Sequence, residues 1–88
     1  MEPYSLSFKK GVEKDLRKIP KEIVLHIFDH VENLVNEPVP HDAYKLASAE
    51  NLYRIRVGDY RVIYQVLHVN REVTVKYIRH RSVAYRGL

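Results

Sequence analysis

Apolar residues recur along the chain with two different periods. Between positions 12 and 35 they lie three or four residues apart, which is the period of an amphipathic helix. Between positions 52 and 80 they alternate with polar residues, which is the period of a strand. A shorter alternation, Tyr4, Leu6 and Phe8, predicts a strand over residues 3–8. The pattern therefore predicts an initial strand, then helices, then a sheet.

Two helices are predicted in the first half. The apolar side of the first helix consists of Val12, Leu16 and Ile19. Ser7 is expected to cap this helix, and Pro20 suits the first turn of the second one. The second helix carries an apolar stripe over residues 23–35 and is expected to end near Asn36. The short connection between them predicts an antiparallel helical hairpin.

The second half predicts a three-stranded antiparallel meander. Its strands are Leu52–Val57, Tyr60–Leu67 and Val73–His80, and Gly58-Asp59 between the first two is a strong signal for a tight hairpin. Residues 37–50 contain two prolines and are expected to be a loop. The predicted fold class is α+β, a single domain over residues 1–88 with both helices on one face of a small sheet.

Strict alternation along the strands assigns side chains to the two faces. Arg54 and Arg56 share one face of their strand, and Arg61 joins them if the helices cover the other face. On the last strand the same rule groups Arg79 with Tyr77, Val75 and Val73, and His80 with Ile78. The sequence therefore predicts a cluster of arginines on the face opposite the helices, which Arg79 or Arg81 would approach from the end of the last strand.

Charge is distributed unevenly and supports this cluster. The net charge is +4, but residues 1–43 hold six basic and eight acidic residues, and residues 44–88 hold nine basic and three acidic ones. Seven of the eight arginines lie between Arg54 and Arg86, and guanidinium groups suit phosphate oxygens and stack on bases. This half is expected to bind a polyanion such as nucleic acid, or else to form a solvated basic face that can dock an acidic protein.

Composition narrows the remaining possibilities. The absence of cysteine excludes disulfides and thiolate zinc sites, and no apolar run reaches the roughly 20 residues of a membrane span. We expect no membrane association and a cytoplasmic location. His26 and His30 have a metal-ligand spacing but no third ligand at a suitable spacing, so we expect no metal and no other cofactor.

Two further residues are candidates for chemistry. His80 lies between Arg79 and Arg81, and a histidine can exchange protons near neutral pH. Tyr85 either packs the C-terminal tail onto the sheet or stacks on a base. The residues alone leave both alternatives open.

Two stretches resemble the RelE/ParE toxin superfamily. They are Leu-Tyr-Arg-Ile-Arg-Val-Gly-Asp-Tyr-Arg-Val-Ile-Tyr, from Leu52 to Tyr64, and Tyr-Ile-Arg-His-Arg-Ser-Val-Ala-Tyr-Arg, from Tyr77 to Arg86. The upstream helical hairpin, the Glu-Pro-Val-Pro loop and Lys45-Leu46 fit the same pattern. The resemblance covers nearly the whole chain and implies a toxin held in check by a RelB-like antitoxin in a heteromeric complex. The RelE-like branch implies an endoribonuclease that cleaves mRNA on the ribosome without a metal.

The resemblance also implies roles for individual residues. Arg61 would stabilise the charge that develops on the phosphate, Arg81 would act at the leaving oxygen, and Tyr85 would stack on or orient the substrate. The expected RNA-binding residues are Arg54, Arg56, Lys45 and Arg79. The best-known member has lysines where this chain has Arg54 and Arg56, and arginine is a poor general base. Either electrostatics and positioning carry the reaction, or His80 handles the proton.

Two other functions are compatible with the same fold. The ParE-like branch inhibits DNA gyrase and cleaves no RNA, although it usually lacks this set of arginines and tyrosine. A non-catalytic module that only binds protein or RNA is the third alternative.

Overall fold

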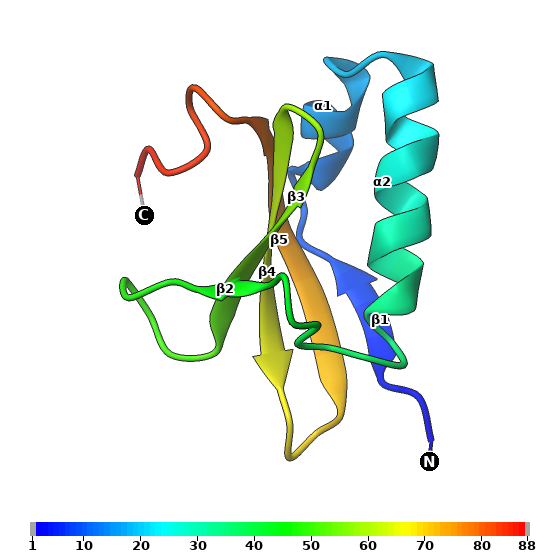
Figure 1. The fold of residues 1–88 in the computed structure, drawn as a ribbon, viewed down its shortest axis with the longest axis vertical. Helices are drawn as coiled ribbons and strands as arrows, with labels where there is room; N and C mark the ends of the chain where they lie inside the picture. The colour runs from blue at the N-terminus through cyan, green and yellow to red at the C-terminus, as the bar shows by residue number, and fades with distance from the viewer. Residues whose placement is uncertain (1, 88) are drawn as a thin grey trace.

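The computed structural model describes residues 2–87 and contains five strands and two helices (Figure 1). In chain order they are β1 (Ser5–Phe8), α1 (Val12–Arg17), α2 (Lys21–Asn33), β2 (Tyr44–Lys45), β3 (Leu52–Val57), β4 (Tyr60–Leu67) and β5 (Glu72–His80). The strands form one sheet in the order β1-β5-β4-β3-β2, and both helices pack on the same face of it. The predicted α+β class, helical hairpin and meander are confirmed.

The sheet differs from the expectation at its two edges. β1 pairs with β5 in parallel, so the sheet is mixed. The helical hairpin returns the chain to the end of the sheet where β1 began, and an up-down-up meander that starts there ends parallel to β1 (Figure 1). At the opposite edge the predicted loop over residues 37–50 contains the short strand β2, which pairs antiparallel with β3.

The predicted start of the first helix is wrong. Ser7 lies in β1, where its Oγ is 3.1 Å from Oγ1 of Thr74, so it cannot cap a helix. The helix begins at Val12 after Gly11, whose φ of 138° is a conformation that glycine adopts without strain. Pro20 is the residue immediately before α2, one position earlier than expected.

The hydrophobic core lies between the helices and the sheet. The fully buried side chains on this side include Val12, Ile27, Val31, Val62, Tyr64, Val66, Val73 and Val75. Tyr64 is the largest of them, and its hydroxyl donates a hydrogen bond of 2.8 Å to the carbonyl oxygen of Pro38. That bond ties the loop after α2 to the centre of the core. In the part of the chain described, neither helix has the length and apolar content needed to cross a membrane.

A bulge in β5 overturns the strict alternation expected for that strand. Ile63 pairs with Tyr77, but the next residue of β4, Tyr64, pairs with Val75, so Lys76 is the extra residue. Val75 and Val73 therefore face the helices, whereas Tyr77 and Arg79 face away from them. Because of the bulge, the first half of β5 can direct its valines to the core while the end of the strand directs Arg79 to the opposite face. It also brings Arg79 onto the same face as Arg61.

Candidate nucleic-acid interface

Three arginines lie directly opposite one another on three adjacent strands. In the register of the sheet Arg56 of β3 pairs with Arg61 of β4, and Arg61 pairs with Arg79 of β5. Directly opposed residues have Cβ atoms about 5 Å apart, and like charges in such positions destabilise a sheet. We call Arg56, Arg61 and Arg79 the arginine row. It lies on the face of the sheet that the helices leave free.

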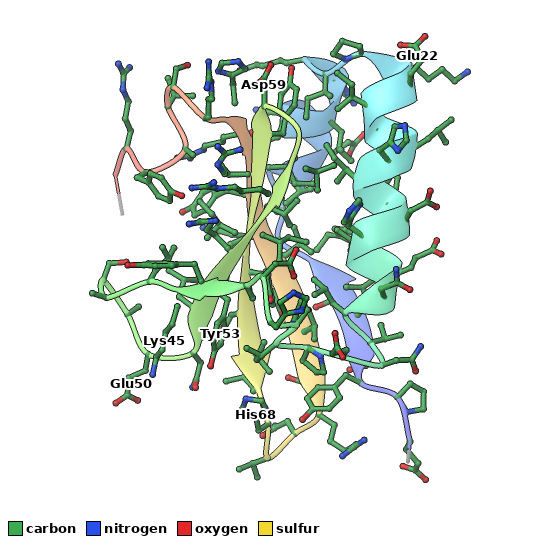
Figure 2. The ribbon with its side chains drawn as sticks, viewed as in Figure 1. Glu22, Lys45, Glu50, Tyr53, Asp59 and His68 are labelled. Atoms are coloured by element: carbon green, nitrogen blue, oxygen red, sulfur yellow. The ribbon has the colours of Figure 1, made fainter. Side chains whose placement is uncertain are left out.

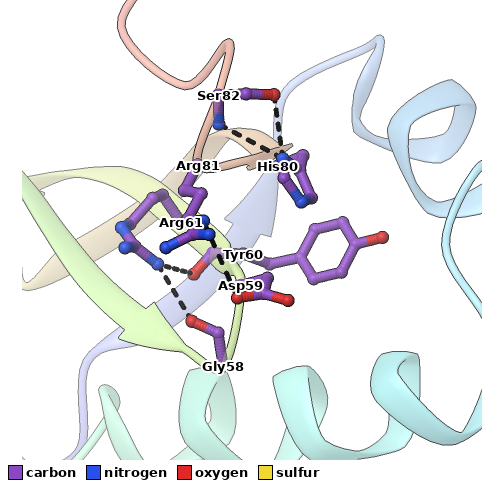
Figure 3. Close-up of polar contacts among 7 residues, drawn as sticks. All are labelled: Gly58, Asp59, Tyr60, Arg61, His80, Arg81 and Ser82. Atoms are coloured by element: carbon purple, nitrogen blue, oxygen red, sulfur yellow. Dashed lines mark hydrogen bonds and ion pairs between the residues drawn. The ribbon is translucent and has the colours of Figure 1, made fainter.

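Backbone carbonyls and a ring hold the row in place. Nη1 of Arg61 donates to the carbonyl oxygens of Gly58 and Tyr60, each at 3.0 Å (Figure 3). Nη1 of Arg79 donates to the carbonyl of Arg86 at 2.9 Å, and its Cζ lies 4.1 Å from the centre of the Tyr77 ring. Within residues 2–87 no carboxylate forms an ion pair with the row. The register therefore places three positively charged residues side by side, with no ion-pair partner among the residues described.

Arg81 follows the last residue of β5 and reaches the β3–β4 turn, whose Gly58 and Tyr60 carbonyls also bind Arg61. Its backbone N–H donates to the carbonyl of Asp59 at 2.8 Å, and its Nε lies 3.8 Å from a carboxylate oxygen of Asp59 (Figure 3). Both side chains of this ion pair are well exposed. The structure thus places Arg79, expected only to bind RNA, directly beside Arg61, and it places Arg81 at the β3–β4 turn.

His80 points to the opposite face from the row. It pairs with Tyr60 in the register, and their rings meet edge to face with centres 5.6 Å apart. Its Nδ1 accepts a hydrogen bond from the backbone N–H of Ser82 at 3.2 Å and lies 2.9 Å from the Ser82 hydroxyl (Figure 3). Tyr60 and His80 line a cavity together with Asp15 and Lys18 of the first helical region. The structure does not bring His80 together with Arg61.

Two of the expected RNA-binding residues are separated in the same way. Arg54 lies on the face of the row and opposite Tyr44 of β2, and its Cζ is 4.9 Å from the centre of the Tyr44 ring. Lys45 instead lies opposite Tyr53, whose ring stacks on the core residue Tyr64. Lys45 is therefore exposed at the sheet edge (Figure 2), and the register assigns it to the face of Tyr53 and not to that of Arg54.

The C-terminal tail lies on the arginine face. It follows β5 on the side of the sheet away from the helices (Figure 1), and the bond from Arg79 to the Arg86 carbonyl holds it there. Ala84 in the tail and Ile63 on this face of β4 are both buried, although neither belongs to the helix-side core. Tyr85 remains 46% exposed. The tail thus packs on the sheet and still presents the tyrosine ring to solvent.

Sequence reasoning missed the contact between Lys9 and Tyr77 on this face. Nζ of Lys9 lies 4.9 Å from the centre of the Tyr77 ring and donates to the Tyr77 hydroxyl at 3.3 Å. Lys9 directly follows β1, so it reaches Tyr77 only because β1 lies beside β5. The parallel pairing of two strands 60 residues apart leaves no local pattern in the sequence that could have shown this contact.

No metal centre emerges among residues 2–87, where no group of three histidine or acidic side chains is arranged to hold an ion. His26 and His30 are both exposed on α2, and Nδ1 of His30 donates to the backbone carbonyl of His26 at 2.8 Å. Their spacing reflects successive turns of one helix.

A sheet with a helical hairpin on one face and clustered arginines on the other is the architecture of a RelE-like toxin. The crystal structure of the archaeal RelE–RelB complex from Pyrococcus horikoshii superimposes with a TM-score of 0.81 at 33% identity, covering 93% of this chain and 99% of that one. The chain is also similar to the RelE1 protein of Methanocaldococcus jannaschii, with 29% identity over 96% of this chain and 97% of the relative. The toxin RelE of Mycobacterium tuberculosis is 29% identical over 96% of this chain and 88% of its own length.

The family described as the ParE toxin of the type II toxin–antitoxin system parDE matches residues 6–85. The chain therefore belongs to the RelE/ParE superfamily of type II toxins, and the three relatives described above are RelE proteins.

Proposed function

We propose that this toxin is a ribosome-dependent endoribonuclease that cleaves mRNA without a metal cofactor. The observation that supports the proposal is the arginine row, in which Arg56, Arg61 and Arg79 are directly opposed across three strands with no carboxylate partner. Directly opposed like charges destabilise the folded state. Their presence is explained if a phosphate binds between the guanidinium groups.

The proposed reaction is transfer of the phosphate within the RNA. The ribose 2′-oxygen loses its proton and bonds to the adjacent phosphorus, the bond from phosphorus to the 5′-oxygen breaks, and the 5′-oxygen takes up a proton. The products are a cyclic phosphate and a free 5′-hydroxyl. Negative charge builds up on the phosphate oxygens, where Arg61 and Arg79 stabilise it. Arg81, at the neighbouring turn, acts at the leaving oxygen, and Tyr85 stacks on or orients the substrate.

The positions of the side chains favour one of the two proton-transfer schemes. His80 points to the helix side of β5, whereas Arg61 and Arg79 occupy the other face. We therefore propose that positioning and electrostatic stabilisation by the arginines carry the reaction. Replacing His80 with alanine should leave the pH profile of cleavage unchanged. A steep loss of rate with a flattened profile near neutral pH would assign the proton transfer to His80.

We further propose that an antitoxin of the RelB type binds this chain and blocks the arginine face. The similar RelE of Pyrococcus horikoshii was crystallised as a RelE–RelB complex. An acidic segment that covers the basic face would keep RNA out. Co-expression with a candidate antitoxin from the adjoining reading frame should give a stoichiometric complex. Expression of the toxin without the antitoxin should arrest growth.

Primer extension on translated message tests the proposed activity. Cleavage in codon register, dependent on translation, is expected. The matching family description names ParE, so inhibition of DNA supercoiling should be measured in parallel. Inhibition of supercoiling without RNA cleavage would assign the chain to the gyrase-directed branch. Antitoxin binding with neither activity would assign it to the non-catalytic modules.

A further inference from the structure

Two of the seven tyrosines are well exposed, and both belong to the arginine face. Tyr44 is 60% exposed and Tyr85 is 46% exposed, whereas the other tyrosines are buried or half-buried. The tail that carries Tyr85 is bonded to Arg79, and Tyr44 pairs with Arg54 in the register of the sheet. An exposed aromatic ring at each side of a group of guanidiniums is a pattern typical of surfaces that bind single-stranded nucleic acid.

One face of the Tyr44 ring is occupied by Arg54, and the rest of the ring is open. Cζ of Arg54 lies 4.9 Å from the ring centre, within the range of a cation–π interaction. Nε of Arg54 is buried and has no hydrogen-bond partner within residues 2–87, so no bond at this atom fixes the guanidinium. Contact with the ring accounts for its orientation. Tyr44 is 60% exposed even with Arg54 over its ring, so much of the side chain is accessible to a ligand.

We propose that Tyr44 is a base-stacking platform for a nucleotide next to the phosphate held by the arginine row. This inference rests on the proposed function and adds a binding residue to it. A base that stacks on the open face of Tyr44 forms a layered arrangement with the tyrosine ring and the Arg54 guanidinium. Arg54 is then also placed to contact the phosphate of the same nucleotide.

The sheet geometry sets the order of the contacts. Tyr44 is on β2 and Arg61 is on β4, two strands away, which corresponds to roughly 10 Å across the sheet. The bound strand thus runs across β2, β3 and β4, from the Tyr44 ring over Arg54 to the row. Tyr85 serves a base on the other side of the phosphate.

Fluorescence of 2-aminopurine tests the platform directly, because stacking quenches it. The probe is placed at each position of the A-site codon in turn, in messages made uncleavable by a 2′-deoxy nucleotide at the scissile position. The wild-type toxin should quench the probe at one position. Tyr44→Leu should remove that quenching and weaken binding roughly ten-fold, the usual loss for one stacked base. Tyr44→Phe keeps the ring and should behave as wild type.

Phe8→Leu is the matched control. Phe8 is 42% exposed, but its ring packs edge to face against Phe28 of α2, on the helix side of the sheet. Loss of this exposed aromatic should leave both quenching and binding unchanged. Unchanged quenching with Tyr44→Leu, or a defect confined to antitoxin binding, would overturn the platform.

Cleavage by the wild-type toxin, measured in parallel, separates this inference from the proposed function. If the wild type cleaves and Tyr44→Leu cannot be distinguished from it in quenching or affinity, the platform is wrong and the nuclease assignment stands. If the wild type does not cleave but its Tyr44-dependent quenching persists, the nuclease assignment is wrong and the platform stands. If neither cleavage nor quenching is seen, both are wrong.

Discussion

The two faces of the sheet use their residues in opposite ways. The helix face is built mainly from buried valines and isoleucines together with Tyr64, whose hydroxyl donates to the carbonyl of Pro38. The other face carries arginines that contact backbone carbonyls and tyrosine rings. The first face gains free energy from burial, whereas the second holds like charges together. Stability and the proposed function therefore belong to different faces and should respond to different substitutions.

The largest effect on stability is expected from the helix face. Ile27 of α2 is fully buried, so Ile27→Ala should lower the free energy of unfolding by about 3–4 kcal/mol through lost burial and a residual cavity. Urea denaturation measures this loss. Leu25→Ala, on the same helix but 62% exposed, should cost less than about 0.5 kcal/mol. Similar losses for the two variants would mean that α2 does not pack on the sheet through Ile27.

The arginine row should show the reverse behaviour. Arg61→Ala should reduce cleavage on translating ribosomes about 10²–10³-fold while the urea midpoint changes little, because Arg61 bonds only to carbonyls next to its own turn. Arg79→Ala should reduce cleavage by nearly the same factor. Arg81→Ala should lose less, because its guanidinium lies beside Asp59.

The control for these variants lies at the far end of the sheet. Arg71 is in the β4–β5 turn, where its guanidinium stacks on Tyr4, so Arg71→Ala should cleave at the wild-type rate. Cleavage at the wild-type rate by Arg61→Ala would remove Arg61 from the site altogether. A larger loss for Arg81→Ala than for Arg79→Ala would return the principal role to Arg81.

An intermediate effect is expected from the polar group buried in the apolar face. Burial raises the pKa of Tyr64 well above its usual value near 10, and the nearby Tyr53 and Asp42 raise it further. Below pH 10 the tyrosine is neutral in both the folded and unfolded chain, so this residue adds no pH dependence. Above pH 10 the unfolded chain ionises first, and the free energy of unfolding falls as pH rises.

Tyr64→Phe isolates this contribution. Near pH 7 the variant should lose about 1 kcal/mol with the hydrogen bond to the Pro38 carbonyl. Above pH 10 the difference from wild type should shrink, since phenylalanine cannot ionise. Chemical denaturation at pH 7, 9, 10.5 and 11 measures both effects, and a difference that stays constant over this range would contradict the assignment.

The sequence predicted the helix face better than the arginine face, for physical reasons. Buried residues recur every 3.6 positions in a helix and every second position in a strand. Local periodicity therefore predicts that Ile27, Val31 and alternate residues of β3 and β4 are buried. Arg54, Arg56 and Arg61 were placed correctly because their strands alternate without interruption. Arg79 was grouped correctly with Tyr77 but wrongly with Val73 and Val75, because the bulge at Lys76 resets the alternation.

Contacts between segments that are distant in the sequence could not be predicted either. Lys9 meets Tyr77 only through the parallel pairing of β1 with β5, and Tyr44 meets Arg54 only through a two-residue strand within a predicted loop. These pairings follow from how the chain returns to the sheet edges, which no local pattern encodes. His80 was singled out for its neighbours in sequence, yet alternation points it away from them.

The smallest predicted effect measures what the arginine row costs the fold. Arg56 is exposed, is directly opposite Arg61, and takes part in no ion pair within residues 2–87. Arg56→Gln removes one of the opposed charges and should raise the melting temperature by roughly 1–3 °C at low salt. The gain should shrink in about 0.5 M salt, where the charges are screened.

Arg17→Gln is the control. Arg17 pairs with Glu13 at 2.8 Å, so replacing Arg17 should leave the melting temperature unchanged or slightly lower. A lower melting temperature for Arg56→Gln at low salt would show that the arginine row stabilises the fold, so that no bound phosphate is needed to explain it.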